Sequence, residues 1–248
     1  MADVSPGDRI AALEAELAEV RAEMQEFTAT VSHDLRAPLR HIVSYGQMVQ
    51  EDAGPLLNAE MQGFLATIAN SAHHMGLLLD GLAALSKVGS ALVVLESVAL
   101  QEAVQEACDR LSSKHPQRVV GWQLPTDLPV VLADAALLQL VLEQLLGNAL
   151  KFTAPRENAL IVVSTSPAEQ AGHIRLQVQD NGVGFNPVKQ DKLFRVFGRL
   201  HSAQQFDGIG MGLVLARKRV QRMGGTLAIE GVVDGGCSVR LSLPLAPG

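Results

Sequence analysis

One histidine stands beside one carboxylate early in the chain, at His33 and Asp34. A neutral imidazole nitrogen can attack a phosphoryl group, and a neighbouring carboxylate can hold the other ring nitrogen and take its proton. Pro38 follows within a segment that the apolar spacing predicts to be helical. Because proline cannot donate to the carbonyl four residues earlier, we expect a bend or loosened turn there. The alternative is a surface His-Asp pair with no role.

A second set of polar residues recurs at helical spacing. Gln144, Asn148 and Lys151 are four and three residues apart, so they share one face of a predicted helix. An amide oxygen is a suitable ligand for Mg²⁺, and a lysine can neutralise phosphate oxygens. Taken alone, the same pattern is also typical of a solvated polar face.

A carboxylate and two glycines follow a predicted strand, at Asp180, Gly182 and Gly184. A carboxylate at a strand end can accept a hydrogen bond from an exocyclic amine such as that of adenine. Glycines allow the backbone to approach a flat base closely. The alternative interpretation is an ordinary Asp-Asn-Gly turn.

Three alternating glycines precede a further predicted helix. Gly208, Gly210 and Gly212 come directly before the helix expected from Leu213. Backbone N–H groups at a helix N-terminus attract anions such as phosphate. Glycine spacing of this kind is common, so the indication is weak when it stands alone.

In this order, the segments resemble the dimerisation and catalytic core of the sensor histidine kinases over residues 24–244. The stretch around His33 and the segment from Phe197 to His201 are most similar to the phytochrome-type branch. The resemblance implies that His33 is phosphorylated, with Asp34 as general base and Arg199 reaching the γ-phosphate. Phe194 and Phe197 would anchor a lid. The implied nucleotide-binding residues are Gln144, Asn148, Lys151, Asp180, Gly182, Gly184, Gly208, Gly210, Gly212 and Leu213, with Asn148 also holding Mg²⁺.

The resemblance also implies the cofactors and partners. ATP and Mg²⁺ would be used by a homodimer, under the control of an upstream sensor domain or protein. The phosphoryl group would pass to an aspartate of a separate response regulator. Two readings remain open: a non-catalytic scaffold or phosphotransfer module, and an ATPase of the same superfamily that uses water as the acceptor.

Three positions depart from the commonest family pattern. Gln144 replaces an asparagine, and Ile209 replaces a small hydroxyl residue of the last glycine segment. Ala37 stands where many relatives carry Thr or Asn to orient water for dephosphorylating their partner. We therefore predict weak phosphatase activity.

The elements that must position these residues are predicted to form an α+β protein of two domains. An apolar a/d stripe from Ile10 to Val31 predicts a coiled-coil signal helix at 1–26, supported by attractive Arg9–Glu14 and Glu16–Arg21 pairs. A single amphipathic helix is the alternative. Residues 27–89 would form a helical hairpin, with its second helix at 59–87, that dimerises as a four-helix bundle. A hinge is expected at 88–90.

Residues 90–248 are predicted to form an α/β sandwich of the Bergerat ATP-binding type. We expect helices at 98–111, 135–151 and 213–222 and strands at 129–132, 160–165, 174–179, 226–230 and 238–243. The stretch 182–211 reads as irregular. Helices would cover one face of a mixed sheet.

Composition narrows the classes of protein that remain possible. The net charge is −6 without a basic block, which argues against nucleic-acid binding. The longest apolar runs fall short of the roughly 18 residues of a membrane span, so we expect a cytoplasmic protein. Cys108 and Cys237 suggest free thiols, with one buried disulfide as the alternative. Other residues read as structural or site-adjacent, namely His41, His73, His74, Trp122 and His201.

Overall fold

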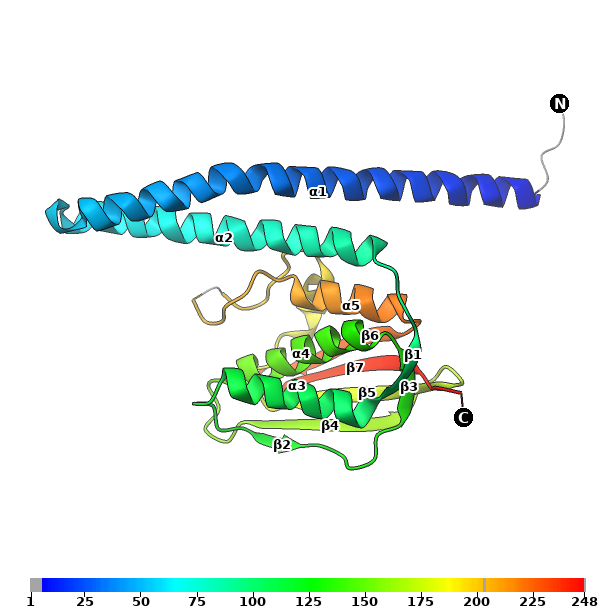
Figure 1. Ribbon diagram of the computed structural model, residues 1–248. Helices are drawn as coiled ribbons and strands as arrows, with labels where there is room; N and C mark the ends of the chain where they lie inside the picture. The colour runs from blue at the N-terminus through cyan, green and yellow to red at the C-terminus, as the bar shows by residue number, and fades with distance from the viewer. Residues whose placement is uncertain (1–5, 203, 248) are drawn as a thin grey trace. The chain divides into compact units, whose positions relative to one another are not determined.

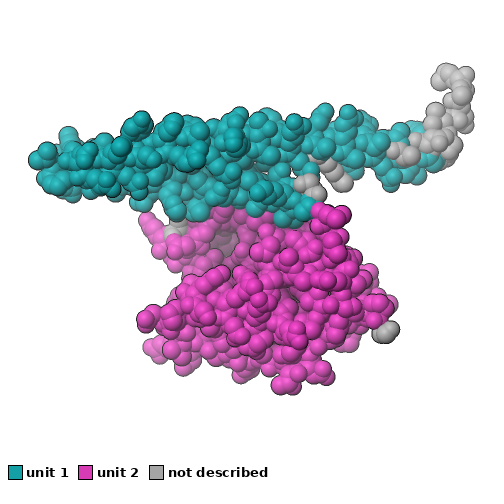
Figure 2. Space-filling view, viewed as in Figure 1, with its two compact units in different colours: residues 1–91 teal, residues 92–248 magenta. Residues whose placement is uncertain are grey.

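The computed structural model describes residues 6–202 and 204–247 and divides after Ala91 into two compact units (Figures 1 and 2). The first unit is helical, and the second is an α/β sandwich. Residues 1–5 of the predicted coiled coil lie outside the described chain.

The first unit is a hairpin of two helices that lie side by side (Figure 1). Helix α1 (Pro6–Asp52) is helical throughout, so Pro38 does not interrupt it. A short 3-10 turn, η1 (Gly54–Leu56), leads to α2 (Ala59–Ser90). The Asn58 side chain caps α2 by accepting a 2.9 Å hydrogen bond from the Met61 amide.

Two tertiary interactions fix the register of this hairpin. Arg36 on α1 pairs with Asp80 on α2, with 2.8 Å between Nη2 and Oδ1. Nearer the open end, the Ser86 hydroxyl donates to the Gln25 carbonyl at 3.0 Å. Both ties cross between the helices, so they oppose sliding of one helix along the other.

The residues of the predicted hinge at 88–90 are helical. These residues form the last turn of α2, and the connection begins at Ala91, whose amide still donates to the Lys87 carbonyl at 3.0 Å. Val88 is buried, and burial of an apolar side chain favours continuation of the helix past the glycine that follows.

The apolar stripe of α1 remains uncovered within the first unit. Its members are 37% to 66% exposed: Ile10, Leu13, Leu17, Val20, Met24, Phe27 and Val31. Further along the hairpin, Leu35, Ile42, Phe64 and Ile68 are exposed as well. Such a large apolar surface on a helical hairpin is characteristic of an interaction surface.

Helices cover one face of a five-stranded sheet in the second unit (Figure 1). The helices are α3 (Leu100–Lys114), α4 (Ala135–Phe152) and α5 (Gly212–Arg222). The sheet order is β2-β4-β5-β7-β6, with β2 and β4 parallel and the other pairs antiparallel. Its strands are β2 (Gly121–Gln123), β4 (Leu160–Pro167), β5 (His173–Asp180), β6 (Thr226–Val232) and β7 (Gly236–Pro244). A separate antiparallel pair joins β1 (Glu96–Ala99) to β3 (Val130–Ala133).

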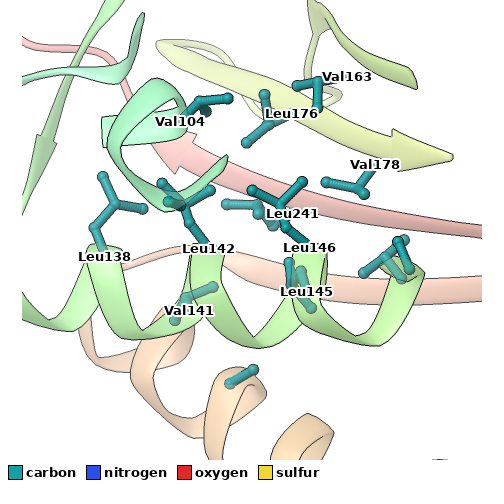
Figure 3. Packing of buried hydrophobic residues seen from close by; sticks show 14 of the residues in the cluster. Val104, Leu138, Val141, Leu142, Leu145, Leu146, Val163, Leu176, Val178 and Leu241 are labelled. Atoms are coloured by element: carbon teal, nitrogen blue, oxygen red, sulfur yellow. The ribbon is translucent and has the colours of Figure 1, made fainter. Parts of the chain in front are cut away.

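Helix α4 supplies the centre of the core (Figure 3). Its apolar face, which includes Leu142 and Leu146, is fully buried opposite Leu176 of β5 and Leu241 of β7. The Asp134 side chain caps the helix by accepting from the Leu137 amide at 3.0 Å. The core thus fixes the axial rotation of α4 and so the direction of its polar face.

The structure corrects several predicted elements. Strands β1 and β2 were not predicted, and the residues predicted to open α3 belong to β1, where Val98 pairs with Val131. The stretch predicted as irregular contains a 3-10 segment, η2 (Pro187–Phe194). Cys108 and Cys237 are both free thiols, which excludes the disulfide. No helix within the described residues is long and apolar enough to span a membrane.

Candidate active site

Two adjoining cavities lie between α4 and the segment before α5. The outer cavity has a volume of about 200 Å³, and its lining includes Gln144, Lys151, Arg199 and Gly210. The inner cavity measures about 50 Å³, and its lining includes Asp180 and Gly184. Six residues line both cavities: Asn148, Phe152, Leu193, Leu200, His201 and Leu213. The cavities are therefore neighbouring compartments of one site.

The polar face of α4 forms one wall of the outer cavity. Gln144, Asn148 and Lys151 all line it, as their spacing predicted. Gln144 Nε2 donates to Asn148 Oδ1 at 3.1 Å, and Lys151 Nζ donates to the Asp207 carbonyl at 3.2 Å. Burial lowers the pKa of Lys151, and the nearby Arg199 guanidinium lowers it further. A desolvated ammonium beside a second cation is well placed to receive an anionic ligand.

Asp180 brings a carboxylate to the lining of the inner cavity, among mostly apolar neighbours such as Val178, Phe185 and Ile229. Its side chain is only 6% exposed. Burial raises the pKa of Asp180 to about 6, although the backbone amides of Gly182 and Cys237 donate to the carboxylate and oppose the shift. A hydrogen-bond acceptor in a flat apolar slot suits the amine edge of a purine.

The glycines near Asp180 are required by the protein's own backbone. A Cβ at Gly182 would lie 2.5 Å from the Phe152 carbonyl oxygen. Gly184 has φ +59°, and a Cβ there would lie 1.8 Å from the Val232 carbonyl oxygen. Only Gly184 of the two lines a cavity. Close backbone packing is therefore one reason for a glycine at each of these two positions.

The second glycine group borders the outer cavity. Gly208, Gly210 and Gly212 all line it, together with Leu213 in the first turn of α5. Helix α5 begins at Gly212, so its N-terminus adjoins the polar face of α4. Gly210 has φ +74°, and a Cβ there would lie 2.5 Å from the Gly198 carbonyl oxygen.

We call residues 195–202 and 204–211 the lid. Arg199 lines the outer cavity, where its Nη2 donates to the Phe206 carbonyl at 2.6 Å. Phe194, just before the lid, is half-buried beneath the Arg217 guanidinium, which lies 4.4 Å from its ring centroid. Phe197 is 37% exposed, has φ +61° and lines neither cavity. The two phenylalanines thus differ, and only Phe194 is packed against the core.

Several lining residues were missed from the sequence. Phe152 and Phe206 were not identified, and His201 was interpreted only as structural or site-adjacent, yet their rings form a cluster at the junction of the cavities. Phe152 directly follows Lys151, so its place at the end of the polar helix was the available signal.

The candidate phosphoacceptor lies on α1 of the first unit. His33 and Asp34 have side chains 84% and 71% exposed, and His33 Nδ1 lies 3.2 Å from Asp34 Oδ1. The contact involves Nδ1, so Nε2 is the ring nitrogen that takes no part in it. The position of Ala37, one turn further, is also exposed. The His33 imidazole is therefore accessible within this unit.

The fold and the site define a class of protein: an ATP-binding α/β domain joined to a helical hairpin that carries an exposed histidine. A model of the "His Kinase A (phospho-acceptor) domain" matches residues 23–91, and one of the "Histidine kinase-, DNA gyrase B-, and HSP90-like ATPase" matches residues 133–247. Together the two matches identify the chain as a sensor histidine kinase core, with a phosphoacceptor domain followed by an ATPase domain.

Curated relatives agree with this assignment. Cyanobacterial phytochrome B of Nostoc sp. is 29% identical over 95% of this chain and 31% of its own length. The methanogenesis regulatory histidine kinase FilI of Methanothrix harundinacea is 31% identical over 96% of this chain and 26% of its own length. The chain thus spans about a third or less of the relatives it matches.

Solved structures share the fold. Full-length ShkA, crystallised with AMPPNP, superposes with a TM-score of 0.63 at 24% identity, over 90% of this chain and 47% of ShkA. The histidine kinase AdeS of Acinetobacter baumannii gives a TM-score of 0.60 at 18% identity, over 87% of this chain and 98% of AdeS. At these identities the likeness concerns the fold alone.

Proposed function

We propose that this chain is an ATP-dependent protein-histidine kinase that phosphorylates its own His33 and passes the phosphoryl group to an aspartate of a separate response regulator. The proposal rests on two features that occur together. The His33–Asp34 pair is exposed on α1. In the second unit, Lys151 and Arg199 line a cavity that adjoins the one lined by the buried carboxylate of Asp180. A non-catalytic scaffold would need neither an exposed histidine–carboxylate pair nor cavities lined by these charged residues.

The two cavities suit the two ends of ATP. Asp180 in the inner cavity would accept from the adenine amine. Lys151 and Arg199 in the outer cavity would neutralise phosphate oxygens, and the N-terminus of α5 after Gly212 would add backbone donors. The charges of the outer cavity are thus complementary to a polyphosphate.

Asn148 is the residue best suited to hold Mg²⁺. Its Oδ1 already accepts from Gln144 Nε2 and retains a second lone pair, and the residue lines both cavities. When bound, Mg²⁺ would neutralise negative charge that develops during transfer. Gln144 orients the Asn148 amide by this contact.

The geometry of α1 favours Nε2 of His33 as the nucleophile, because Nδ1 faces Asp34. Nε2 would form a bond to the γ-phosphorus as the bond from that phosphorus to the β–γ bridging oxygen breaks, and ADP would leave. Asp34 would hold Nδ1–H, stabilise the cationic phospho-imidazole and take the proton as general base. Arg199 would offset charge on the transferring oxygens.

We infer that the working unit is a homodimer. Two hairpins would bury their exposed apolar faces as a four-helix bundle, and the stripe from Ile10 to Val31 would continue as a parallel coiled coil. In this division, residues 1–26 receive a signal from an upstream sensor, 27–89 hold the phosphoacceptor and 90–248 bind ATP. We place the protein in the cytoplasm, where ATP is available.

The proposal is tested with γ-labelled ATP and Mg²⁺. We expect acid-labile, alkali-stable label on the parent chain and none on His33→Gln. His41→Gln is the matched control, because His41 is an exposed histidine on the same helix. Asp34→Asn should slow labelling by about 10²-fold or more.

Two results would contradict the proposal. ATP binding without label on any histidine would favour a scaffold. Release of inorganic phosphate at the same rate from the parent and His33→Gln, again without label, would favour an ATPase that uses water.

A further inference from the structure

His201 lies at the boundary between the inner and outer cavities and lines both of them. It is half-buried on the lid, two residues after Arg199. Its neighbours come from three separate segments: the end of α4, the loop after β5 and the lid itself. This position makes His201 a candidate link between the parts of the site that face a base and those that face phosphates.

The first contact ties the lid to the base side. His201 Nε2 lies 2.9 Å from the carbonyl oxygen of Gly184, which lines the inner cavity with Asp180. A carbonyl oxygen only accepts, so Nε2 carries a hydrogen and donates it. The backbone at Gly184 also packs closely against Val232, because a Cβ at Gly184 would meet the Val232 carbonyl oxygen.

The second contact is a cluster of three rings. The His201 centroid lies 5.5 Å from that of Phe152 and 5.3 Å from that of Phe206, and the two phenylalanine centroids are 4.9 Å apart. These separations lie within the range of favourable aromatic pairs. The cluster holds Phe206 of the lid against the last residue of α4.

The third contact reaches the arginine. The Phe206 carbonyl accepts from Arg199 Nη2 at 2.6 Å, a short hydrogen bond with a charged donor. A continuous series of contacts therefore runs from Gly184 through His201 and Phe206 to Arg199. All of it lies within the second unit.

We propose that His201 is a positioning residue that couples recognition of the base to the placement of Arg199. Its N–H holds the lid against Gly184, in the loop that follows the base-recognising carboxylate at the end of β5. Its ring holds Phe206, and so the carbonyl that binds Arg199. The ligand is a nucleoside triphosphate, with its base and phosphates on either side of His201. This inference rests on the proposed function of the second unit as an ATP site.

Two substitutions separate the donor from the ring. His201→Phe keeps an aromatic ring but removes the donor, whereas His201→Gln keeps an ε-nitrogen donor but removes the ring. We expect His201→Phe to weaken ATP binding about 3- to 10-fold, as one net hydrogen bond is lost. We expect His201→Gln to bind ATP within about twofold of the parent but to leave the lid open.

The experiment combines two measurements on the full chain. ATP affinity is measured with Mg²⁺ by displacement of a fluorescent ATP analogue. Lid closure is measured as the rate of tryptic cleavage after Arg195 and Arg199 at saturating ATP. Saturating ATP should protect both sites in the parent, less in His201→Phe, which loses the hydrogen bond to Gly184, and least in His201→Gln, which loses the ring contact with Phe206.

Control variants and thermal melts show whether the effects on ATP affinity and lid closure are specific to position 201. His115→Phe and His115→Gln change an exposed histidine of the same unit that lines neither cavity, and both should match the parent. Melting of all variants without nucleotide shows whether the second unit stays equally folded.

The outcomes are distinct. If the parent itself does not bind ATP, the proposed nucleotide site is wrong and this inference falls with it. If the parent binds ATP and both His201 variants match it, the coupling is refuted while the nucleotide site stands. Equal loss of affinity and protection in both variants, with a lowered melting temperature, would show that His201 only stabilises the fold.

Discussion

Gly212 at the start of α5 lies directly against the amide of Gln144 on α4. A Cβ at Gly212 would come within 2.3 Å of Gln144 Nε2. That amide donates to Asn148 Oδ1 at 3.1 Å, so the glycine leaves room for the group that orients the proposed Mg²⁺ ligand. Because Gly212 has no side chain, the Gln144 amide has room to lie where it donates to Asn148.

This relationship predicts that Gly212→Ala folds but binds Mg²⁺-ATP about 3- to 10-fold more weakly, because the flexible Gln144 end moves and Asn148 loses its donor. Calorimetric titration gives the affinity. Adding Gln144→Ala removes the clash, so the double variant should lose less than the sum of the two single losses. Strictly additive losses would contradict this account.

Gly184→Ala should behave differently from Gly212→Ala, because a Cβ at Gly184 would meet a backbone atom instead of the end of a flexible side chain. A Cβ at that position would meet the Val232 carbonyl oxygen at 1.8 Å, and φ is +59°. We expect a fall in the free energy of unfolding of about 2 kcal/mol or more. Urea unfolding of the two alanine variants side by side should rank Gly184→Ala as clearly the less stable. A similar loss in Gly212→Ala would show that Gln144 cannot move aside.

The buried carboxylate predicts a dependence of stability on pH. The pKa of Asp180 rises from 3.8 to about 6 in the folded protein. Its stabilising contribution is therefore fully present below about pH 4 and is lost as the pH rises through about 6. Asp180→Asn should be the more stable protein at pH 7.5, by at most about 3 kcal/mol, and this difference should shrink as the pH falls. A difference that stays constant from pH 4.5 to pH 7.5 would exclude the shifted carboxyl.

The same group predicts the opposite trend for ATP. The ionised carboxylate would accept from the adenine amine, so affinity should fall as the pH drops through about 6. Asp180→Asn should bind ATP about tenfold more weakly or worse and lack that step. Calorimetric titration between pH 5 and pH 8 measures the ATP affinity of both proteins, and only the parent should show the step.

Ala37 predicts a kinase with little phosphatase activity. It lies four residues after His33 on the same helix and so on the same face, but its methyl group cannot orient water. Ala37→Thr should raise the rate at which the phosphorylated response regulator loses phosphate, with unfolding changed by less than about 0.5 kcal/mol because the position is exposed. Ala22→Thr, at an exposed position nearer the N-terminus of the same helix, is the control. Efficient dephosphorylation by the parent, with no gain in Ala37→Thr, would refute this prediction.

The exposed stripe of α1 predicts the effect of a charge in the proposed dimer interface. Leu17 is 49% exposed in the single chain and lies on the stripe. Leu17→Lys should raise the dimer dissociation constant about tenfold or more, since one buried leucine contributes roughly 2 kcal/mol. Sedimentation equilibrium measures it, with Ala22→Lys on the opposite side of the helix as control. An unchanged constant would place the interface elsewhere.

Local patterns predicted the parts of the site that depend on one helix or one strand end. The spacing of Gln144, Asn148 and Lys151 sets a common face, and the structure places all three on one cavity. Asp180 was expected to follow a strand at 174–179, and the structure makes it the last residue of β5. Helical and strand periodicity determine such relations without reference to the rest of the chain.

Contacts between distant segments could not be predicted in the same way. Gly184 is required by Val232, which lies 48 residues later, and His201 gains its place from Phe152 and Phe206. Strand β2 has only the three residues Gly121–Gln123 and depends on pairing with β4. A three-residue strand carries too little alternation to be recognised, because its stability comes from its partner.

Strand β7 follows every other element of the nucleotide site along the described chain, yet it lies inside the sheet between β5 and β6. It pairs Cys237 with Asp180 and supplies one of the two amides that donate to that carboxylate. During synthesis on the ribosome, a nascent chain that stops short of Gly236 would leave β5 as an open edge and Asp180 without that donor. Nucleotide capture would then become possible only once β7 has been synthesised and has paired with β5, so nascent chains that lack β7 would not bind nucleotide.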